Sequence, residues 1–122
     1  MVERSILALN QVEQKAAQFL ASFNTDVVKE VQDAIKKSPI VVVGMAQNPF
    51  CKRAVKSLEL AGFSVHYIEY GSYFQGWKKL LAIKMWSGWP TFPQVFVKGK
   101  LVGGCQDTEA AIKDGILRKL LD

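Results

Sequence analysis

Apolar residues near the start of the chain recur every three or four positions. In residues 5 to 23 this spacing predicts an amphipathic helix. A second helix is expected from residue 25 to residue 37, where Asn24 or Thr25 is suited to cap its start. Ser38 precedes Pro39, and the residue before a proline avoids helical geometry, so the second helix ends there. The apolar positions of the first helix are Ile6, Leu9, Val12, Ala16, Phe19, Leu20 and Phe23.

From residue 40 the pattern alternates between strands and helices. Residues 40 to 43 are all apolar and β-branched, which is typical of a strand buried on both faces. A helix is expected up to Ala61, with Gly62 as its C-terminal cap. Apolar and polar residues then alternate from 63 to 68, which predicts a half-buried strand. The β-α-β order predicts two parallel neighbouring strands joined by a right-handed crossover.

The last fifty residues add a helix, a hairpin and a helix. A helix is expected over residues 73 to 87, and strands over 94 to 97 and 100 to 102. Lys98-Gly99 joins these strands, and a two-residue connection with glycine second predicts a tight antiparallel turn. A final helical region covers residues 106 to 121 and is loosened at Gly115. The predicted fold class is therefore α/β, a mixed sheet of about four strands flanked by helices.

Length and composition indicate one globular domain, which divides into a helical extension, residues 1–24, and a main domain, residues 25–122. Net charge is +5, but the 16 basic residues are scattered among 11 acidic ones and cluster only in pairs. Such pairs usually lie on solvated helix faces, so we expect no nucleic-acid surface. No apolar run approaches the roughly 20 residues of a membrane span. We find no secretory signal, and two cysteines form no disulfide framework, which favours the cytoplasm.

The candidate chemistry lies at Asn48-Pro49-Phe50-Cys51, between the first predicted strand and the helix that follows. A strand that runs into a helix through Cys-x-x-Cys is the usual redox site of a βαβ domain. Here the second cysteine is present, but asparagine replaces the first. The sequence therefore has the framework of a thiol enzyme without its expected nucleophile.

Three segments in this order resemble a glutaredoxin: Asn48 to Cys51, Thr91-Phe92-Pro93, and Gly103-Gly104-Cys105. The segment from Trp89 to Gly99 and its continuation to Cys105 is most similar to the monothiol subfamily. The resemblance covers about residues 26 to 121 and implies a thioredoxin-like fold that binds glutathione. Dithiol members of that family reduce disulfides and glutathione mixed disulfides. Monothiol members mostly carry and transfer a [2Fe-2S] cluster held by one cysteine and glutathione.

Two alignments with the family compete at the active site. In the first, Asn48 stands at the nucleophile and Cys51 at the resolving cysteine of a dithiol site. In the second, Cys51 is the nucleophile of a monothiol site. Helix physics favours the first, because asparagine is among the best N-cap residues and proline is favoured at the first helical position.

Cys51 is the candidate thiol in either alignment, and would also be the protein ligand of a cluster. A glutaredoxin nucleophile must be a thiolate, which the N-terminus of a helix stabilises. The amide of Asn48 cannot attack a disulfide. Cys51 lies one turn into the helix, near Lys52 and Arg53, but a side chain at this position commonly points toward the protein. Catalysis by Cys51 requires its sulfur to be accessible beside the glutathione groove.

The resemblance also implies a glutathione site. Pro93 would be a cis-proline, and the backbone of Phe92 would bind the cysteinyl part of the tripeptide. Gly104 would let the backbone come close, and the helix start at Cys105 and Gln106 would bind the γ-glutamyl carboxylate. Where the family usually has an aspartate this chain has Gln106, and Asp107 is the expected substitute. A family lysine is missing near the end of the first strand, so binding is expected to be weaker.

Three functions follow from the resemblance. The first is glutathione-linked thiol–disulfide exchange in cell redox homeostasis, an electron transfer with protein thiols as clients. The second is a [2Fe-2S] carrier that serves iron–sulfur recipient proteins, as a cluster-bridged homodimer rather than a monomer. The third is a redox-inactive binding module, because Asn48 replaces the nucleophile.

Overall fold

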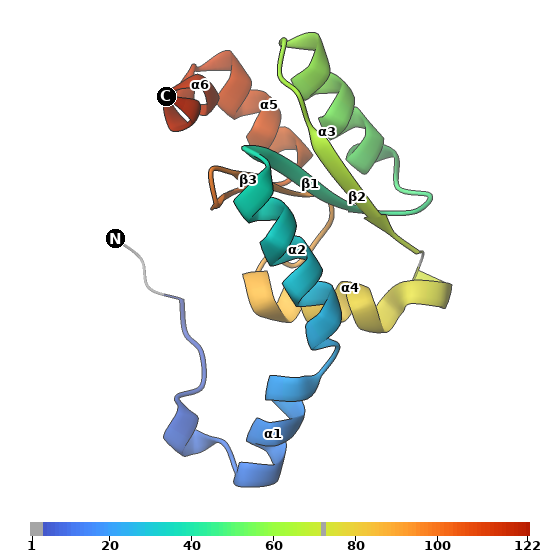
Figure 1. Ribbon diagram of the computed structural model, residues 1–122, viewed down its shortest axis with the longest axis vertical. Helices are drawn as coiled ribbons and strands as arrows, with labels where there is room; N and C mark the ends of the chain where they lie inside the picture. The colour runs from blue at the N-terminus through green and yellow to red at the C-terminus, as the bar shows by residue number, and fades with distance from the viewer. Residues whose placement is uncertain (1–3, 72) are drawn as a thin grey trace.

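A computed structural model describes residues 4–71 and 73–122 of the chain. Its helices and strands follow the predicted order and form a sheet with helices on both faces (Figure 1). The elements are a 3₁₀ turn, Leu9–Gln11, and then α1 Gln14–Ser22, α2 Thr25–Lys37, β1 Ile40–Met45, α3 Pro49–Leu60, β2 His66–Tyr70, α4 Tyr73–Ser87, β3 Gln94–Val97, β4 Lys100–Gly103, α5 Cys105–Lys113 and α6 Ile116–Leu121.

The four strands form one mixed sheet in the order β2-β1-β3-β4. β1 pairs with β2 in parallel, and β3 runs antiparallel to both β1 and β4. Helices α2 and α4 contact each other on one face, while α3, α5 and α6 cover the other. This α/β architecture, a four-stranded mixed sheet with flanking helices and additional N-terminal helical structure, confirms the predicted fold class.

β1 lies at the centre of the sheet and is buried on both faces, as its apolar run predicts. Val41 and Val43 belong to the core under α2 and α4, while Ile40 and Val42 belong to the core under α3, α5 and α6. All four side chains are almost inaccessible to solvent. The alternation of a strand places successive side chains on opposite faces, so one short segment contributes to both cores.

The second strand begins later than predicted, at His66 rather than at residue 63. The end of α3 explains the difference. Gly62 adopts a positive φ of 93°, and the next amide, of Phe63, donates to the carbonyl of Leu58 at 3.0 Å. This C-terminal motif ties residue 63 to the helix, so pairing with β1 starts only when His66 lies opposite Val41. Phe63 still packs against the core, as its apolar phase predicts.

The N-terminal helix is also shorter than the predicted 5 to 23. It begins after Glu13, whose carboxylate accepts a hydrogen bond from the amide of Lys15 at 2.8 Å. None of its residues is buried, and Phe19 remains 60% exposed. α1 extends away from the sheet (Figure 1), so tertiary packing does not lengthen it. The division between residues 24 and 25 stays a prediction, although α2 does begin at Thr25.

Two turns follow the sequence closely. Lys98 and Gly99 both have positive φ, 51° and 80°, which is the geometry of the predicted two-residue hairpin between β3 and β4. Gly115, with φ 83°, separates α5 from α6 at the predicted position.

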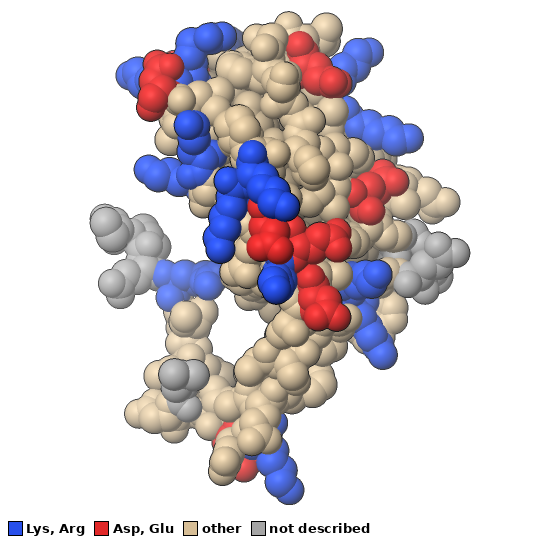
Figure 2. Space-filling model, in the orientation of Figure 1, with Lys and Arg blue, Asp and Glu red and all other residues tan. Residues whose placement is uncertain are grey.

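Charged side chains are mixed on the surface. On the face in Figure 2, Lys and Arg lie among Asp and Glu, as expected from basic residues that occur only in pairs. Among the described residues, no helix has the length and apolar character that crossing a membrane would require.

Candidate functional site

Helix α3 begins at Pro49, with Asn48 as its N-cap, as the first of the two alignments requires. The side-chain oxygen of Asn48 accepts hydrogen bonds from the amides of Phe50 at 2.9 Å and Cys51 at 3.4 Å. Pro49 has no amide hydrogen to offer. The asparagine therefore satisfies the free donors of the first turn, which in a thiolate site would stabilise the sulfur anion.

Cys51 is fully buried, with 0% of its surface exposed. Its Cβ lies close to Gly44, where an added methyl group would come within 2.9 Å of it. Burial raises the pKa of the Cys51 thiol, and the hydrogen bond from the backbone of Met45 offsets this only in part. The accessible sulfur that catalysis by Cys51 would require is therefore not present in this structure, because the absence of a side chain at Gly44 leaves room for the cysteine in the core.

The peptide bond between Phe92 and Pro93 is cis, as predicted. It lies beside the start of α3, and the side-chain amide of Asn48 donates a long hydrogen bond, 3.5 Å, to the carbonyl of Phe92. Asn48 thus contacts the segment that the resemblance assigns to glutathione binding.

A groove of about 460 Å³ opens between these two segments and the start of α5. It brings together every predicted site residue except Cys51. The residues that line it are Met45, Asn48, Phe50, Trp89, Thr91, Phe92, Pro93, Gly104, Cys105, Gln106 and Asp107.

The α5 end of the groove is built on two glycines. Gly103 has a φ of 127°, and the carboxylate of Asp107 lies over it where a side chain would otherwise stand. This carboxylate accepts a hydrogen bond from the amide of Gly104 at 3.0 Å, and Thr108 donates to the carbonyl of Gly104 at 2.8 Å. The next amides, those of Cys105 and Gln106, are first-turn donors without an intrahelical acceptor. This end therefore suits a negatively charged group.

Cys105 is the thiol that lines the groove. It is 5% exposed, and burial raises the pKa of its thiol, with a further increase from the negative charge of Glu109. A hydrogen bond joins its side chain to Glu109. Both cysteines are free thiols. At neutral pH both are therefore expected to be mainly protonated and slow to react.

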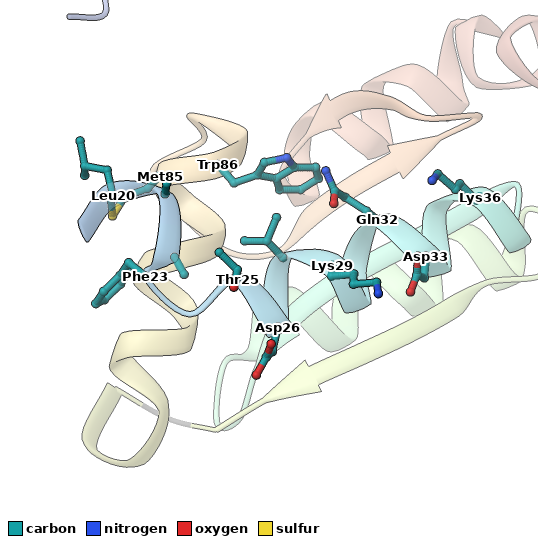
Figure 3. A pocket seen from close by; sticks show the side chains of 13 residues that line it. Leu20, Phe23, Thr25, Asp26, Lys29, Gln32, Asp33, Lys36, Met85 and Trp86 are labelled. Carbon is teal, nitrogen blue, oxygen red and sulfur yellow. The ribbon is translucent and has the colours of Figure 1, made fainter. Parts of the chain in front are cut away.

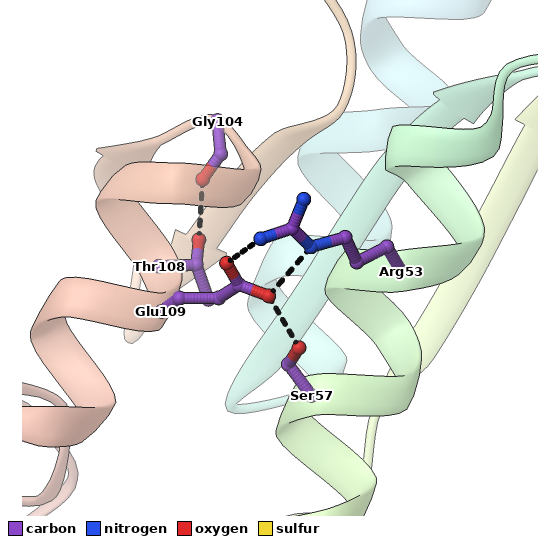
Figure 4. Close-up of polar contacts among 5 residues, drawn as sticks. All are labelled: Arg53, Ser57, Gly104, Thr108 and Glu109. Carbon is purple, nitrogen blue, oxygen red and sulfur yellow. Dashed lines mark hydrogen bonds and ion pairs between the residues drawn. The ribbon is translucent and has the colours of Figure 1, made fainter.

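A polar network links α3 to α5 next to Cys105 (Figure 4). The guanidinium of Arg53 donates two hydrogen bonds to the carboxylate of Glu109, at 2.9 and 2.6 Å, and the hydroxyl of Ser57 donates a third at 2.7 Å. Glu109 is not among the residues that the sequence predicts for the site. No local pattern could have indicated it, because its partners are more than fifty positions away and only the packing of the helices brings them together.

This network predicts a pH dependence of stability. The hydrogen bonds from Arg53 and then Ser57 lower the pKa of Glu109. A carboxylate with a lowered folded-state pKa stabilises the fold above its unfolded pKa, about 4.3, and loses this contribution as the pH falls through the folded value. Denaturant unfolding should therefore show a difference in the free energy of unfolding between wild type and Glu109→Gln at pH 7, which shrinks below about pH 4. An equal difference at pH 7 and pH 3 would contradict this role.

A larger hollow, of about 750 Å³, lies between α1, α2 and α4 (Figure 3). Leu20, Phe23, Met85 and Trp86 give it an apolar side, and charged residues of α2 line its edge. It contains neither cysteine and none of the predicted site residues. Its chemistry therefore does not favour it as the redox site. Among the described residues no group of His, Cys, Asp and Glu is arranged to hold a metal ion.

Known proteins resemble this chain in sequence. A family model described as Glutaredoxin matches residues 40–102. A "Glutaredoxin-like protein" of Dictyostelium discoideum is 43% identical over 109 residues, 89% of each chain. The bifunctional monothiol glutaredoxin-S16 of Arabidopsis thaliana is 36% identical over 95 residues, which cover 72% of this chain and 32% of that protein.

Solved structures share the fold. The buckwheat glutaredoxin–glutathione complex has a TM-score of 0.67 and 27% identity, with 80% of this chain and 88% of that chain covered. The chain therefore belongs to the glutaredoxin family.

Proposed function

We propose that this protein binds glutathione in the groove and takes part in glutathione-linked thiol–disulfide exchange, with a slow intrinsic rate. The observation that carries the proposal is the convergence of Phe92-Pro93, Gly104 and the start of α5 on one groove that also contains a thiol. The buckwheat glutaredoxin that shares this fold is described as a complex with glutathione.

The slow rate follows from the two thiols. Cys51, the candidate from the sequence, is buried and would react when a local opening exposes it. Cys105 lines the groove, but its pKa is also raised. In either case a thiolate would attack glutathione disulfide, form a mixed disulfide with the protein and release one glutathione thiolate. Because thiolates are the reacting form, the rate should increase with pH.

Burial of Cys51 argues against cluster transfer, whereas thiol exchange can also use Cys105, which lines the groove. A [2Fe-2S] cluster shared by two copies would need the Cys51 sulfur at the surface, and this sulfur is enclosed in the core. The monothiol assignment, the cluster-bridged dimer and the recipient proteins therefore stay predictions. A binding module without redox activity is the outcome expected if neither thiol reacts.

Two measurements test the proposal. Calorimetric titration with S-methylglutathione, which cannot exchange disulfides, should show saturable binding. Incubation with glutathione disulfide from pH 6 to pH 9 should then yield a mixed disulfide by mass spectrometry, faster at higher pH. The variants Cys51→Ser and Cys105→Ser should show which thiol carries it. Absence of binding would contradict the glutathione site, whereas binding without mixed disulfide would leave a redox-inactive module.

A further inference from the structure

The two ends of the groove differ in their capacity for negative charge. At the α5 end, the amides of Cys105 and Gln106 are first-turn donors without an intrahelical acceptor. At the α3 end, the amides of Phe50 and Cys51 already donate to Asn48, and Pro49 has none. The amides at the start of α3, which could have bound a second anion, are therefore already hydrogen-bonded to Asn48.

The charged side chain in the groove also lies at the α5 end. Among the described residues that line it, Asp107 is the only charged one, and no lysine or arginine is present. Arg53 lies on α3, but its guanidinium is paired with Glu109. A carboxylate and free amides together match the head of an amino acid, which carries one ammonium and one carboxylate. The α5 end therefore has complements for both charges of a γ-glutamyl group.

The α3 end of the groove is apolar. Met45 lies at the end of β1, and Phe50 on the first turn of α3 is 49% exposed. Pro93 also lines the groove, and its carbonyl lies 3.6 Å from where a methyl group on Gly104 would stand. A carboxylate placed against the side chains of Met45 and Phe50 would lose water without gaining a hydrogen bond or a cation from them. Glutathione carries a second carboxylate, on its glycyl residue, and no positively charged side chain among the described residues that line the groove complements it.

We propose that the groove selects a γ-glutamyl thiol peptide with a single carboxylate, one whose glycyl carboxyl is an amide or ester, over free glutathione. The inference rests on the proposed function, because it assumes that the γ-glutamyl thiol peptide binds in this groove. It assigns the selectivity to Asn48, which consumes the anion-binding amides, and to Met45 and Phe50, which form an uncharged surface.

The test compares S-methylglutathione with its glycyl amide by calorimetry at pH 7. The two ligands differ only in one charge, and neither can exchange disulfides. We expect the amide to bind roughly three- to fivefold more tightly at low salt. The difference should shrink at high salt, because screening weakens the interaction of partly exposed charges.

A charge placed at the α3 end should abolish the selectivity. Phe50→Lys adds a cation at an exposed position, so the free acid should bind at least as tightly as the amide. Phe50→Gln, the matched control without charge, should keep the wild-type preference. Equal or tighter binding of the free acid to the wild type would overturn the inference and leave the glutathione site intact. Binding of neither ligand would instead overturn the proposed function, and the inference with it.

Discussion

Replacing Asn48 with cysteine is expected to convert this protein into an efficient glutathione-dependent oxidoreductase. The amides of Phe50 and Cys51 now donate to the asparagine oxygen, and they would become available to a thiolate in its place. Thiols at helix N-termini have pKa values of about 3.5–7.5, whereas an ordinary cysteine is only a few per cent ionised at pH 7. The rate of mixed-disulfide reduction should therefore rise at least about tenfold.

With a cysteine at position 48, Cys51 could also act as a second, resolving cysteine. It lies one turn further along α3, at the position of the second cysteine of Cys-x-x-Cys. The double variant Asn48→Cys/Cys51→Ser should therefore reduce glutathione mixed disulfides but lose the ability to form an internal disulfide. Reduction of a glutathionylated peptide, followed by a coupled glutathione reductase assay, measures the first activity. Thiol counting after oxidation measures the second.

Asn48→Ser is the matched control for this experiment. Serine caps a helix about as well as asparagine, so the free energy of unfolding should change little, but it supplies no sulfur. Asn48→Cys should lose about 1 kcal/mol of stability together with the cap. If Asn48→Cys reacts no faster than wild type, the start of α3 is not a thiolate site in this fold.

Gly103→Ala is expected to have the largest effect on the groove. Gly103 has a φ of 127°, a region that other residues rarely adopt, and an added methyl group would stand 2.7 Å from the Asp107 carboxylate. Backbone strain and overpacking together should cost about 2–4 kcal/mol of unfolding free energy. The Asp107 carboxylate also accepts a hydrogen bond from the amide of Gly104, which lines the groove. A displaced carboxylate should therefore disturb the groove, and the variant should bind S-methylglutathione more weakly. Denaturant unfolding and calorimetry measure the two effects.

The variant Gly62→Ala measures the cost of backbone strain without the cost of steric crowding. Gly62 also has a positive φ, 93°, but nothing lies within 4 Å of an added methyl group. Its cost should be only about 1 kcal/mol, without an effect on ligand binding. Adding Asp107→Ala to Gly103→Ala removes the carboxylate but keeps the Cβ that stands 2.9 Å from the added methyl group, so it should restore only part of the lost stability. Equal losses in Gly62→Ala and Gly103→Ala would show that Asp107 does not press on Gly103.

Local patterns were sufficient wherever neighbouring residues decide the structure. The run from Ile40 to Val43 is β-branched and apolar, and it is the central strand. Lys98-Gly99 forms the hairpin because its two residues accept positive φ. Asn48 caps α3 through bonds to amides two and three positions away. In each case the structure is decided by contacts between residues close in sequence, or by the conformational preference of one residue type.

Local patterns failed where distant segments compete. The second strand was predicted three residues too early, because the C-terminal motif of α3 holds Phe63 until pairing with β1 begins. The N-terminal helix was predicted too long, since its apolar period is not matched by a packing partner. The periodicity of a segment shows which of its side chains could be buried on one face. The length of the helix or strand that forms depends on whether other segments of the chain pack against that face.

The sequence by itself determined the family, the order of the elements and the asparagine that caps α3 at Asn48. The tertiary structure decided which thiol meets the groove. Cys51 enters the core because Gly44, on the strand β1 that leads into α3, leaves space for it, and Cys105 reaches the groove because α5 starts there. It also decided that Glu109 joins Arg53 and Ser57. The contacts of Glu109 depend on how helices α3 and α5 pack, and residues more than fifty positions apart carry no local sign of them.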